Sequence, residues 1–218
     1  MMWNKKNPAW FSTVLCFLLA GFVFTFVINI LADDLVFVCR KNNDLFQVVK
    51  SMETPSVRFD KAEDALATLK TGDAALFLAD GYPETTTNLS EQVFEQLSQK
   101  QVKAYIEFPG TLPGFEFRPM RRTRLERVVV LEDVFGEKLK PMDVLAIHDC
   151  HFVETEVDKP LLVLAGVAGY DTAVYGIDDV PSYPILFKRE NLIVSTTKLS
   201  QFVTARYATY ASIQAFWP

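Results

Sequence analysis

Apolar and polar positions in the first half of the chain follow a period that changes from segment to segment. Four short apolar runs, rich in β-branched and aromatic residues, predict strands covered on both faces. They span residues 35–40, 57–60, 74–80 and 103–109. Between these runs, apolar residues recur at helical spacing, which predicts helices over residues 43–52, 61–70 and 89–99. Strands and helices that alternate in this way predict right-handed crossovers and a parallel sheet.

The second half is rich in strand-like runs with little helix between them. They cover residues 127–132, 143–149, 160–169, 172–177, 184–189 and 191–197. Antiparallel hairpins are expected here, with turns at Arg189-Glu190-Asn191 and Gly169-Tyr170-Asp171. A short final helix is predicted from Tyr207, and its shortness predicts that the natural protein continues beyond Pro218. The expected fold is one α/β domain over residues 33–218, a mostly parallel sheet with flanking helices and β-rich additions.

Residues 1–32 follow a different pattern. Lys5 and Lys6 precede a long uncharged apolar stretch that ends at Ala32, which is the arrangement of an export signal. The apolar core of about 23 residues is also long enough to span a bilayer, so cleavage after Ala32 and retention as a membrane anchor both stay open. In either case the domain is expected outside the cytoplasm, periplasmic or extracellular. Membrane contact is expected only through residues 10–32, if they are retained.

The rest of the chain is acidic. Without the first 32 residues it holds 20 basic and 27 acidic residues, a formal net charge of −7, so binding to nucleic acid is not expected. About 186 residues suit a single domain with an adequate core. Cys39 and Cys150 lie in separate strand-like runs. The sequence leaves open whether they form a disulfide or remain two buried thiols.

Acidic and aromatic side chains follow two of the predicted parallel strands. Asp80 and Tyr82 come after the third strand, and Glu107 lies at the end of the fourth. Ligands of open parallel sheets bind beyond the carboxyl ends of the strands, so these residues predict a pocket suited to sugar hydroxyls and ring stacking. The two carboxylates could also perform acid–base chemistry on a glycosidic bond if they stood about 5–9.5 Å apart. The alternative is that all three residues cap and stabilise turns.

One cluster, His148-Asp149-Cys150-His151, is rich in side chains that bind metals. In a strand, alternation would send these side chains to opposite faces, and no second cluster has the spacing of zinc ligands. We therefore expect neither a metal nor a cofactor. His148 remains a candidate ligand-binding residue at the end of its strand.

Five arginines crowd a segment whose proline and polar residues predict a loop. They are Arg118, Arg121, Arg122, Arg124 and Arg127. Guanidinium groups suit carboxylates and phosphates, which would allow an acidic polysaccharide to bind. In an acidic protein, pairing with the chain's own carboxylates or with the next domain is the favoured interpretation.

Several of these segments together resemble a family of modules. They are FLADGYP (77–83), YIEFPGTLPG (105–114), LAIHDCHF (145–152), GYDTAVYG (169–176) and VSTTKLSQFVTARYA (194–208). Over roughly residues 35–217 the chain resembles the class I glutamine-amidotransferase-like module that precedes the catalytic domain of secreted Bacteroidetes glycosidases. The resemblance implies a flavodoxin-like fold and a glycosidase catalytic domain as partner. A glycan is a further candidate partner.

The chemistry of amidotransferases does not survive in this sequence. That reaction needs a cysteine on a tight strand-to-helix turn and a histidine to activate it. The fourth strand is followed by Phe108-Pro109-Gly110 without a cysteine, and Thr196-Thr197-Lys198 stands where the family has His-x-Glu. The only histidines, His148 and His151, precede the last strand. No residue is therefore predicted to be catalytic.

Three functional hypotheses follow. The preferred one is a catalytically silent accessory or structural module of a polysaccharide-degrading glycoside hydrolase. The first alternative is a free-standing carbohydrate-binding protein that uses Asp80, Tyr82 and Glu107. The second is a hydrolase that uses Glu107 or the segment from His148 to His151.

Overall fold

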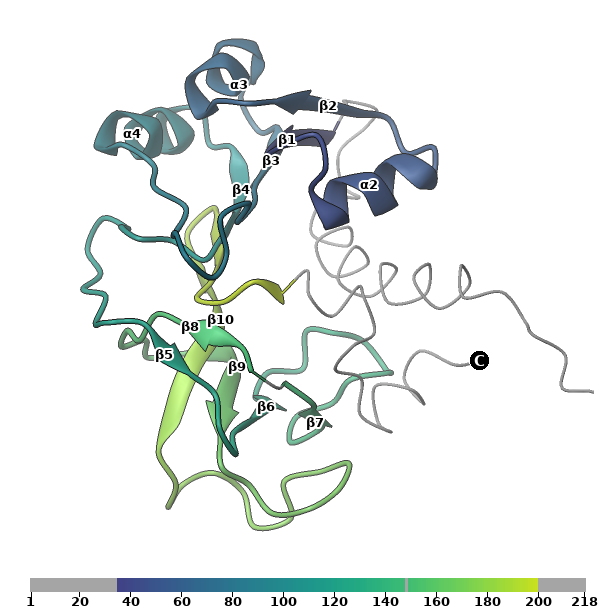
Figure 1. Ribbon diagram of the computed structural model, residues 1–218, viewed down its shortest axis with the longest axis vertical. Coiled ribbons are helices and arrows are strands. Elements are labelled where there is room, and N and C mark those ends of the chain that lie inside the picture. The colour runs from purple at the N-terminus through teal and green to yellow at the C-terminus, as the bar shows by residue number, and fades with distance from the viewer. Residues whose placement is uncertain (1–34, 148, 200–218) are drawn as a thin grey trace, which may run out of the picture.

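The computed structural model describes residues 35–147 and 149–199. Within them, nine strands form one sheet in the order β2-β1-β3-β4-β11-β10-β9-β6-β7, and β5 pairs with β8 in a separate ribbon. Figure 1 shows the helices gathered around the first strands, while the later strands extend away from them. The predicted export signal and the predicted helix from Tyr207 lie outside the described residues. None of the helices in the described ranges has the length and apolar character needed to cross a bilayer.

The first half alternates strands and helices, as predicted. Its elements are β1 (Leu35–Val38), α2 (Asp44–Ser51), β2 (Ser56–Phe59), α3 (Ala62–Thr68), β3 (Ala74–Phe77), α4 (Glu91–Gln99) and β4 (Lys103–Glu107). The neighbouring strands β2, β1, β3 and β4 are all parallel. Two helices begin at capping side chains, because Asn43 accepts hydrogen bonds from the first turn of α2 and Ser90 accepts one from α4.

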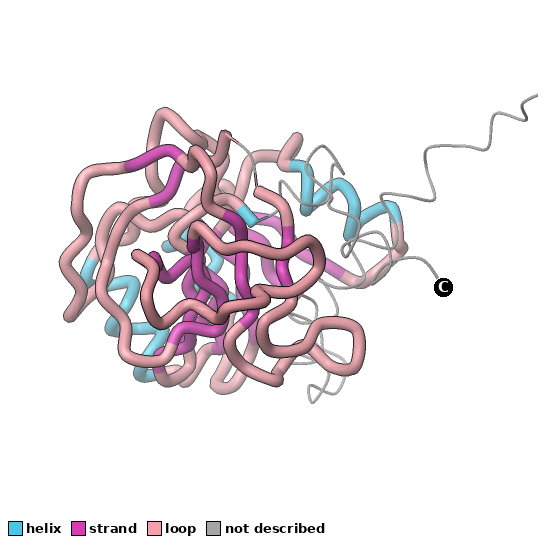
Figure 2. Tube along the Cα trace, turned by 90° about the horizontal axis from the view of Figure 1, so that it is seen from below, coloured by secondary structure: helices cyan, strands magenta, loops and turns pink. Residues whose placement is uncertain are grey.

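The helices cover both faces of the parallel strands (Figure 2). Helix α2 packs through Phe46 onto one face, where its ring meets Phe37 of β1 edge-on at 5.4 Å between centroids. Helices α3 and α4 pack through Leu66 and Leu97 onto the other face, around Phe77 of β3. This arrangement follows from strand geometry, since successive side chains point to opposite faces.

The second half adds antiparallel strands to this sheet. They are β5 (Arg121–Arg122), β6 (Arg127–Val130), β7 (Val144–Leu145), β8 (His151–Phe152), β9 (Pro160–Ala165), β10 (Ser182–Arg189) and β11 (Leu192–Ser195). Strand β11 joins the two halves, because it pairs parallel with β4 and antiparallel with β10. The predicted turn at Arg189-Glu190-Asn191 is confirmed, with Glu190 at a φ of 52°. The chain is therefore an α/β domain with a large mixed sheet and few helices.

One predicted strand is wrong. Residues 172–177 belong to a loop, residues 166–181, that connects β9 to β10. Within it only an isolated bridge from Asp143 to Thr172 has strand character. The chain bends tightly at Gly169, whose φ is 117° and where a Cβ would lie 1.9 Å from the carbonyl oxygen of Thr172. The Gly169-Tyr170-Asp171 corner therefore shapes this loop and is not a hairpin turn.

Candidate functional site

The carboxyl ends of the parallel strands carry a buried polar network centred on Glu107. This residue ends β4 and is fully buried. Its Oε2 accepts a hydrogen bond from the backbone N–H of Ala79 at 3.2 Å, and its Oε1 accepts one from the Tyr105 hydroxyl at 3.2 Å. Burial, followed by the charge of Glu107, raises the pKa of Tyr105 well above its ordinary value. The carboxylate thus joins β3 to β4 inside the protein.

Asp80 ties the end of β3 to the connection between β1 and α2. Its Oδ1 accepts a hydrogen bond from Asn43 Nδ2 at 2.8 Å, and its Oδ2 accepts one from the backbone N–H of Arg40. Asn43 in turn caps α2. Asp80 therefore positions the first helix relative to the sheet, as expected of a turn-stabilising residue.

Tyr82 fastens the two-stranded ribbon to the same edge. Its hydroxyl donates to the carbonyl oxygen of His151 at 3.1 Å and accepts from the N–H of that residue at 2.5 Å. Its ring packs edge-on against Phe108, with the centroids 4.9 Å apart. Thr197 Oγ1 donates to the same His151 carbonyl at 2.7 Å. The fourth predicted residue, His148, lies outside the described residues.

Phe108 occupies the position directly after β4 and has an unusual backbone. Its φ is 51°, in the left-handed region that bulky residues rarely adopt. Its N–H donates to the carbonyl oxygen of Ser195 at 2.7 Å, and its carbonyl accepts from the N–H of Thr87 at 2.8 Å. The fully buried ring packs in a small cluster with Ala79 and Val153. An aromatic side chain therefore fills the centre of this edge.

The structure thus brings Asp80, Tyr82 and Glu107 to one edge of the sheet but engages each of them in contacts within the protein. Of the three, Asp80 also lines a cavity of about 280 Å³. No group of three or more His, Cys, Asp or Glu side chains within residues 35–147 and 149–199 could hold a metal ion. Asp80, Tyr82 and Glu107 therefore lie near one another, but Tyr82 and Glu107 do not line this cavity with Asp80.

The cavity beside Asp80 was missed by sequence analysis. It lies beyond the ends of β1 and β3 and against the starts of α3 and α4, and Cys39, Glu63, Thr87 and Ser90 are among its lining residues. The Oγ1 atom of Thr87 is buried and has no hydrogen-bond partner. The reversal of strand order between β1 and β3 is the signal that could have located the cavity, but nothing in the sequence marks Thr87.

Cys39 and Cys150 are both buried and do not form a disulfide with each other. Burial raises the pKa of the Cys39 thiol to about 12, and the nearby charge of Asp80 adds to this effect. The thiolate is the nucleophilic form of cysteine. Cys39 is therefore an unreactive, protonated thiol at neutral pH.

The arginine cluster is largely neutralised within the protein. Arg118 pairs with Glu154 at 2.7 Å, and Arg121 pairs with the same carboxylate at 3.0 Å. Arg122 pairs with Asp149 at 2.5 Å. The two arginine neighbours hold the pKa of Glu154 below its ordinary value. Part of the predicted loop is strand β5, and these contacts match the internal pairing that was favoured over binding of an acidic polysaccharide.

Comparison with known proteins assigns the chain to no family. No protein-family model matches it, and no curated protein matches it in sequence. The sheet, the contacts at its carboxyl edge and the resemblance seen in the sequence are therefore the features that indicate a function.

Proposed function

We propose that this chain is an exported, catalytically silent, amidotransferase-like module of a polysaccharide-degrading glycoside hydrolase. The order β2-β1-β3-β4-β11 of the parallel strands is compatible with a flavodoxin-like fold. That fold is the one implied by the sequence segments that resemble the module of secreted Bacteroidetes glycosidases. Export to the periplasm or the extracellular space is supported by the sequence pattern of residues 1–32.

The backbone of Phe108 is the observation that carries this proposal. Enzymes that use a strand-to-helix elbow place the nucleophile on a sharp, strained turn directly after a strand. Phe108 follows β4 directly, has a φ of 51° and is followed by Pro109-Gly110. A phenyl ring cannot attack a carbonyl carbon. No helix follows β4 within the described residues. We therefore interpret this position as a turn that has kept the strained backbone of such an elbow and lost both its helix and its nucleophile.

The end of β11 supports the same conclusion. The segment from Ser195 to Thr197 is fully buried and offers only hydroxyl groups. Thr196 Oγ1 donates to the carbonyl oxygen of Pro184 at 2.9 Å, and Ser195 Oγ donates to that of Thr197 at 2.7 Å. These hydroxyls stabilise the backbone and cannot serve as the base that a nucleophile would need.

We expect residues 1–218, expressed without a catalytic domain, to hydrolyse neither glutamine nor glycosides. Ammonia release from glutamine and reducing-end release from a panel of plant polysaccharides should both equal the rate without protein. A Glu107→Gln variant serves as the control for the hydrolase alternative. Hydrolysis by the natural chain that Glu107→Gln abolishes would refute the proposal and establish an enzyme.

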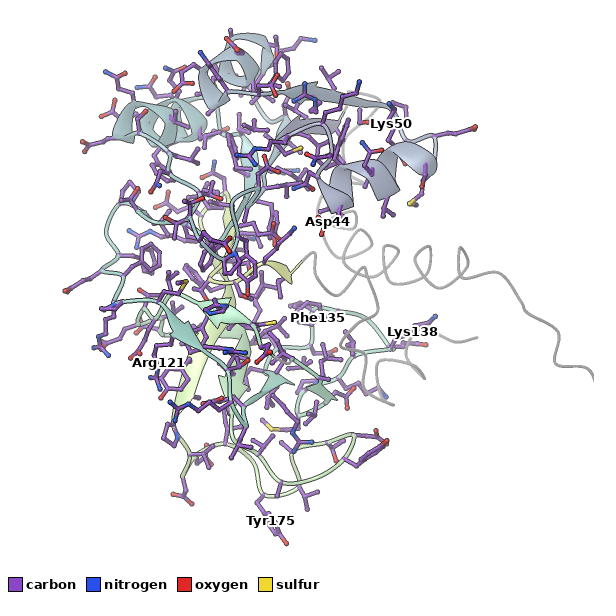
Figure 3. All side chains as sticks on the ribbon, in the orientation of Figure 1. Asp44, Lys50, Arg121, Phe135, Lys138 and Tyr175 are labelled. Carbon is purple, nitrogen blue, oxygen red and sulfur yellow. The ribbon has the colours of Figure 1, made fainter. Side chains whose placement is uncertain are left out.

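The loop of residues 166–181 is suited to hold the catalytic partner. Tyr170, Val174 and Tyr175 are 67%, 63% and 88% exposed, and Figure 3 shows Tyr175 projecting from the end of the molecule that is far from the helices. The loop is nevertheless anchored, because the guanidinium of Arg127 donates to the carbonyl oxygens of Gly169, at 2.7 Å, and Val167. Aromatic residues are enriched in protein interfaces, so an anchored loop that displays two tyrosines supports docking against a neighbouring domain.

Serine at positions 174 and 175 should weaken this association. We expect the double variant Val174→Ser, Tyr175→Ser to bind the glycosidase domain about tenfold more weakly or worse, because buried aromatic anchors dominate interface energies. Val134→Ser is the matched control, since Val134 is also exposed, at 44%, and lies outside the loop. Binding would be measured by calorimetry with the separately expressed domain. Equal losses in both variants would exclude the loop as the interface.

A free-standing carbohydrate-binding protein is the second candidate, and the cavity beside Asp80 favours it. The reading frame beyond the codon for Pro218 separates the two hypotheses. A glycosidase domain in frame supports the module. A stop codon there, with a stable folded product and no glycosidase partner, favours the free-standing protein.

A further inference from the structure

The cavity of about 280 Å³ lies where the order of the parallel strands reverses. The chain goes from β1 outward to β2, and then returns past β1 to β3. Helix α2 covers one face and α3 and α4 the other, so the connections leave β1 and β3 toward opposite faces. In open α/β sheets this is the position at which ligands bind. The cavity is bounded by Cys39, Asp80 and Ser90 at this point.

The lining of the cavity combines an apolar wall with hydroxyl and carboxylate groups. Val38 and Leu89, which are both half-buried, contribute to the wall. Thr87 Oγ1 is buried without a hydrogen-bond partner, and leaving a buried hydroxyl unpaired is costly. Ser90 Oγ accepts from the N–H of Val93 at 3.4 Å as the cap of α4, which leaves its own O–H available as a donor. Asp80 contributes a carboxylate.

The charges around the cavity select against anions. Asp60, Glu63 and Asp80 line it together with a single cation, Lys61, and Asp60 is paired with Arg58 at 2.6 Å. A phosphate or a uronate would face this excess of carboxylates. The volume lies just below the range of about 300–1,000 Å³ that is typical of pockets for drug-sized ligands. One small ring fits it, whereas a chain of several rings does not.

We propose that this cavity binds a single neutral sugar ring, with the Thr87 and Ser90 hydroxyls and the Asp80 carboxylate bonded to sugar hydroxyls and the ring carbons against Val38 and Leu89. The proposal rests on the proposed function and gives the silent module a ligand, such as one residue of the polysaccharide or a product of its degradation. The bound hydroxyl supplies the partner that Thr87 lacks. The inactive elbow at Phe108 takes no part in it.

Titration of the full-length chain with five monosaccharides tests this proposal. D-glucose, D-galactose, D-xylose, L-arabinose and L-rhamnose would be added separately and followed by calorimetry and by amide chemical shifts. We expect at least one of them to bind with a Kd near the millimolar range, which corresponds to a few hydrogen bonds and one apolar face. Glucose 6-phosphate is expected not to bind. If none of the five sugars binds, the proposal is wrong.

Two variants test whether the sugar binds in the cavity or elsewhere on the protein surface. Thr87→Val keeps the shape and removes the unpaired hydroxyl, so we expect sugar binding to weaken about tenfold while Tm is not lowered. Ser90→Thr retains a capping hydroxyl and adds a methyl group to the cavity, and it should also weaken binding. Thr71→Val, at an exposed threonine in the turn before β3, is the matched control and should bind as the natural chain does.

Sugar binding that is unchanged in both cavity variants would place the ligand elsewhere and overturn the assignment. The outcome is independent of the hydrolysis assays, because a silent module can lack a sugar site and a chain that binds sugar can prove to be an enzyme. Loss of binding in Thr87→Val with an unchanged Tm supports the site directly.

Discussion

Replacing Phe108 with alanine is expected to lower the free energy of unfolding by about 3–5 kcal/mol, and replacing it with glycine is expected to lower it by less. The loss arises because the ring is fully buried and packs edge-on against Tyr82. The smaller loss of stability expected for the glycine variant arises from the backbone. At most positions glycine costs about 0.5–1 kcal/mol more than alanine, but at a φ of 51° the side chain itself is strained, and glycine relieves that strain.

Urea denaturation of the two variants measures this order. Phe77 is the matched control, because it is also fully buried and lies within β3. There Phe77→Gly should be less stable than Phe77→Ala. If Phe108→Gly is likewise less stable than Phe108→Ala, the position after β4 is not strained, and the interpretation of Phe108 as a silenced elbow loses its main support.

The first half of the fold could be predicted because local signals agree with one another there. The strand β1 is a short apolar run, and the adjacent helix begins at Asn43, whose side chain caps it. Helical and strand periods differ enough that each segment between residues 35 and 107 fits only one of them. The parallel pairing in this half followed from the alternation of strands and helices, whereas the pairing of β11 with β4 depends on contacts distant in sequence.

The error at residues 172–177 has a physical cause. In this loop Ala173, Ile177 and Val180 pack onto a small cluster beneath it, while Tyr170, Val174 and Tyr175 face outward. Such alternation between buried and exposed side chains also arises in a loop that folds over its own core. The sequence pattern indicates burial, but a strand also needs a neighbouring backbone along its whole length. This segment has one only at its start, where Thr172 bridges to Asp143 and the N–H of Ala173 donates to the carbonyl oxygen of Met142.

The location of the candidate residues was predictable, but their roles were not. Asp80, Tyr82 and Glu107 gather at one edge because parallel strands all end on the same side of the sheet. Their partners come from elsewhere in the chain: Asp80 is bonded to Asn43 and Tyr82 to His151. Only the tertiary structure determines whether a polar side chain at a strand end faces a ligand or another segment of the protein.

The second large effect is expected at alkaline pH and depends on Cys39. Its pKa is raised from an ordinary value of 9.0 to about 12, first by burial and then by the charge of Asp80. Below about pH 9 the thiol is protonated in both the folded and the unfolded chain, so its contribution to stability is complete. Above that pH the unfolded chain releases the proton and the folded chain retains it. The contribution of the Cys39 thiol to the free energy of unfolding is then lost as the pH rises toward about 12.

Between about pH 9 and about pH 12, titration of Cys39 is expected to lower the free energy of unfolding by about 1.4 kcal/mol per pH unit. The total loss amounts to up to about 4 kcal/mol. Cys39→Ala removes the titrating group, so its stability should fall less steeply than that of the natural chain, and the two curves should converge above about pH 9. Other groups that titrate there, Tyr105 among them, affect both proteins alike and cancel in the difference.

Guanidinium denaturation of both proteins at intervals from about pH 8 to about pH 11 measures this difference, and iodoacetamide provides an independent test. The reagent attacks thiolates, so Cys39 should react only when the chain unfolds. Parallel stability curves for the natural chain and Cys39→Ala, or rapid labelling of the native protein at Cys39, would contradict the buried environment that the structure gives this thiol. Because Cys39 lines the same cavity as Thr87, a bound sugar should also slow that labelling further.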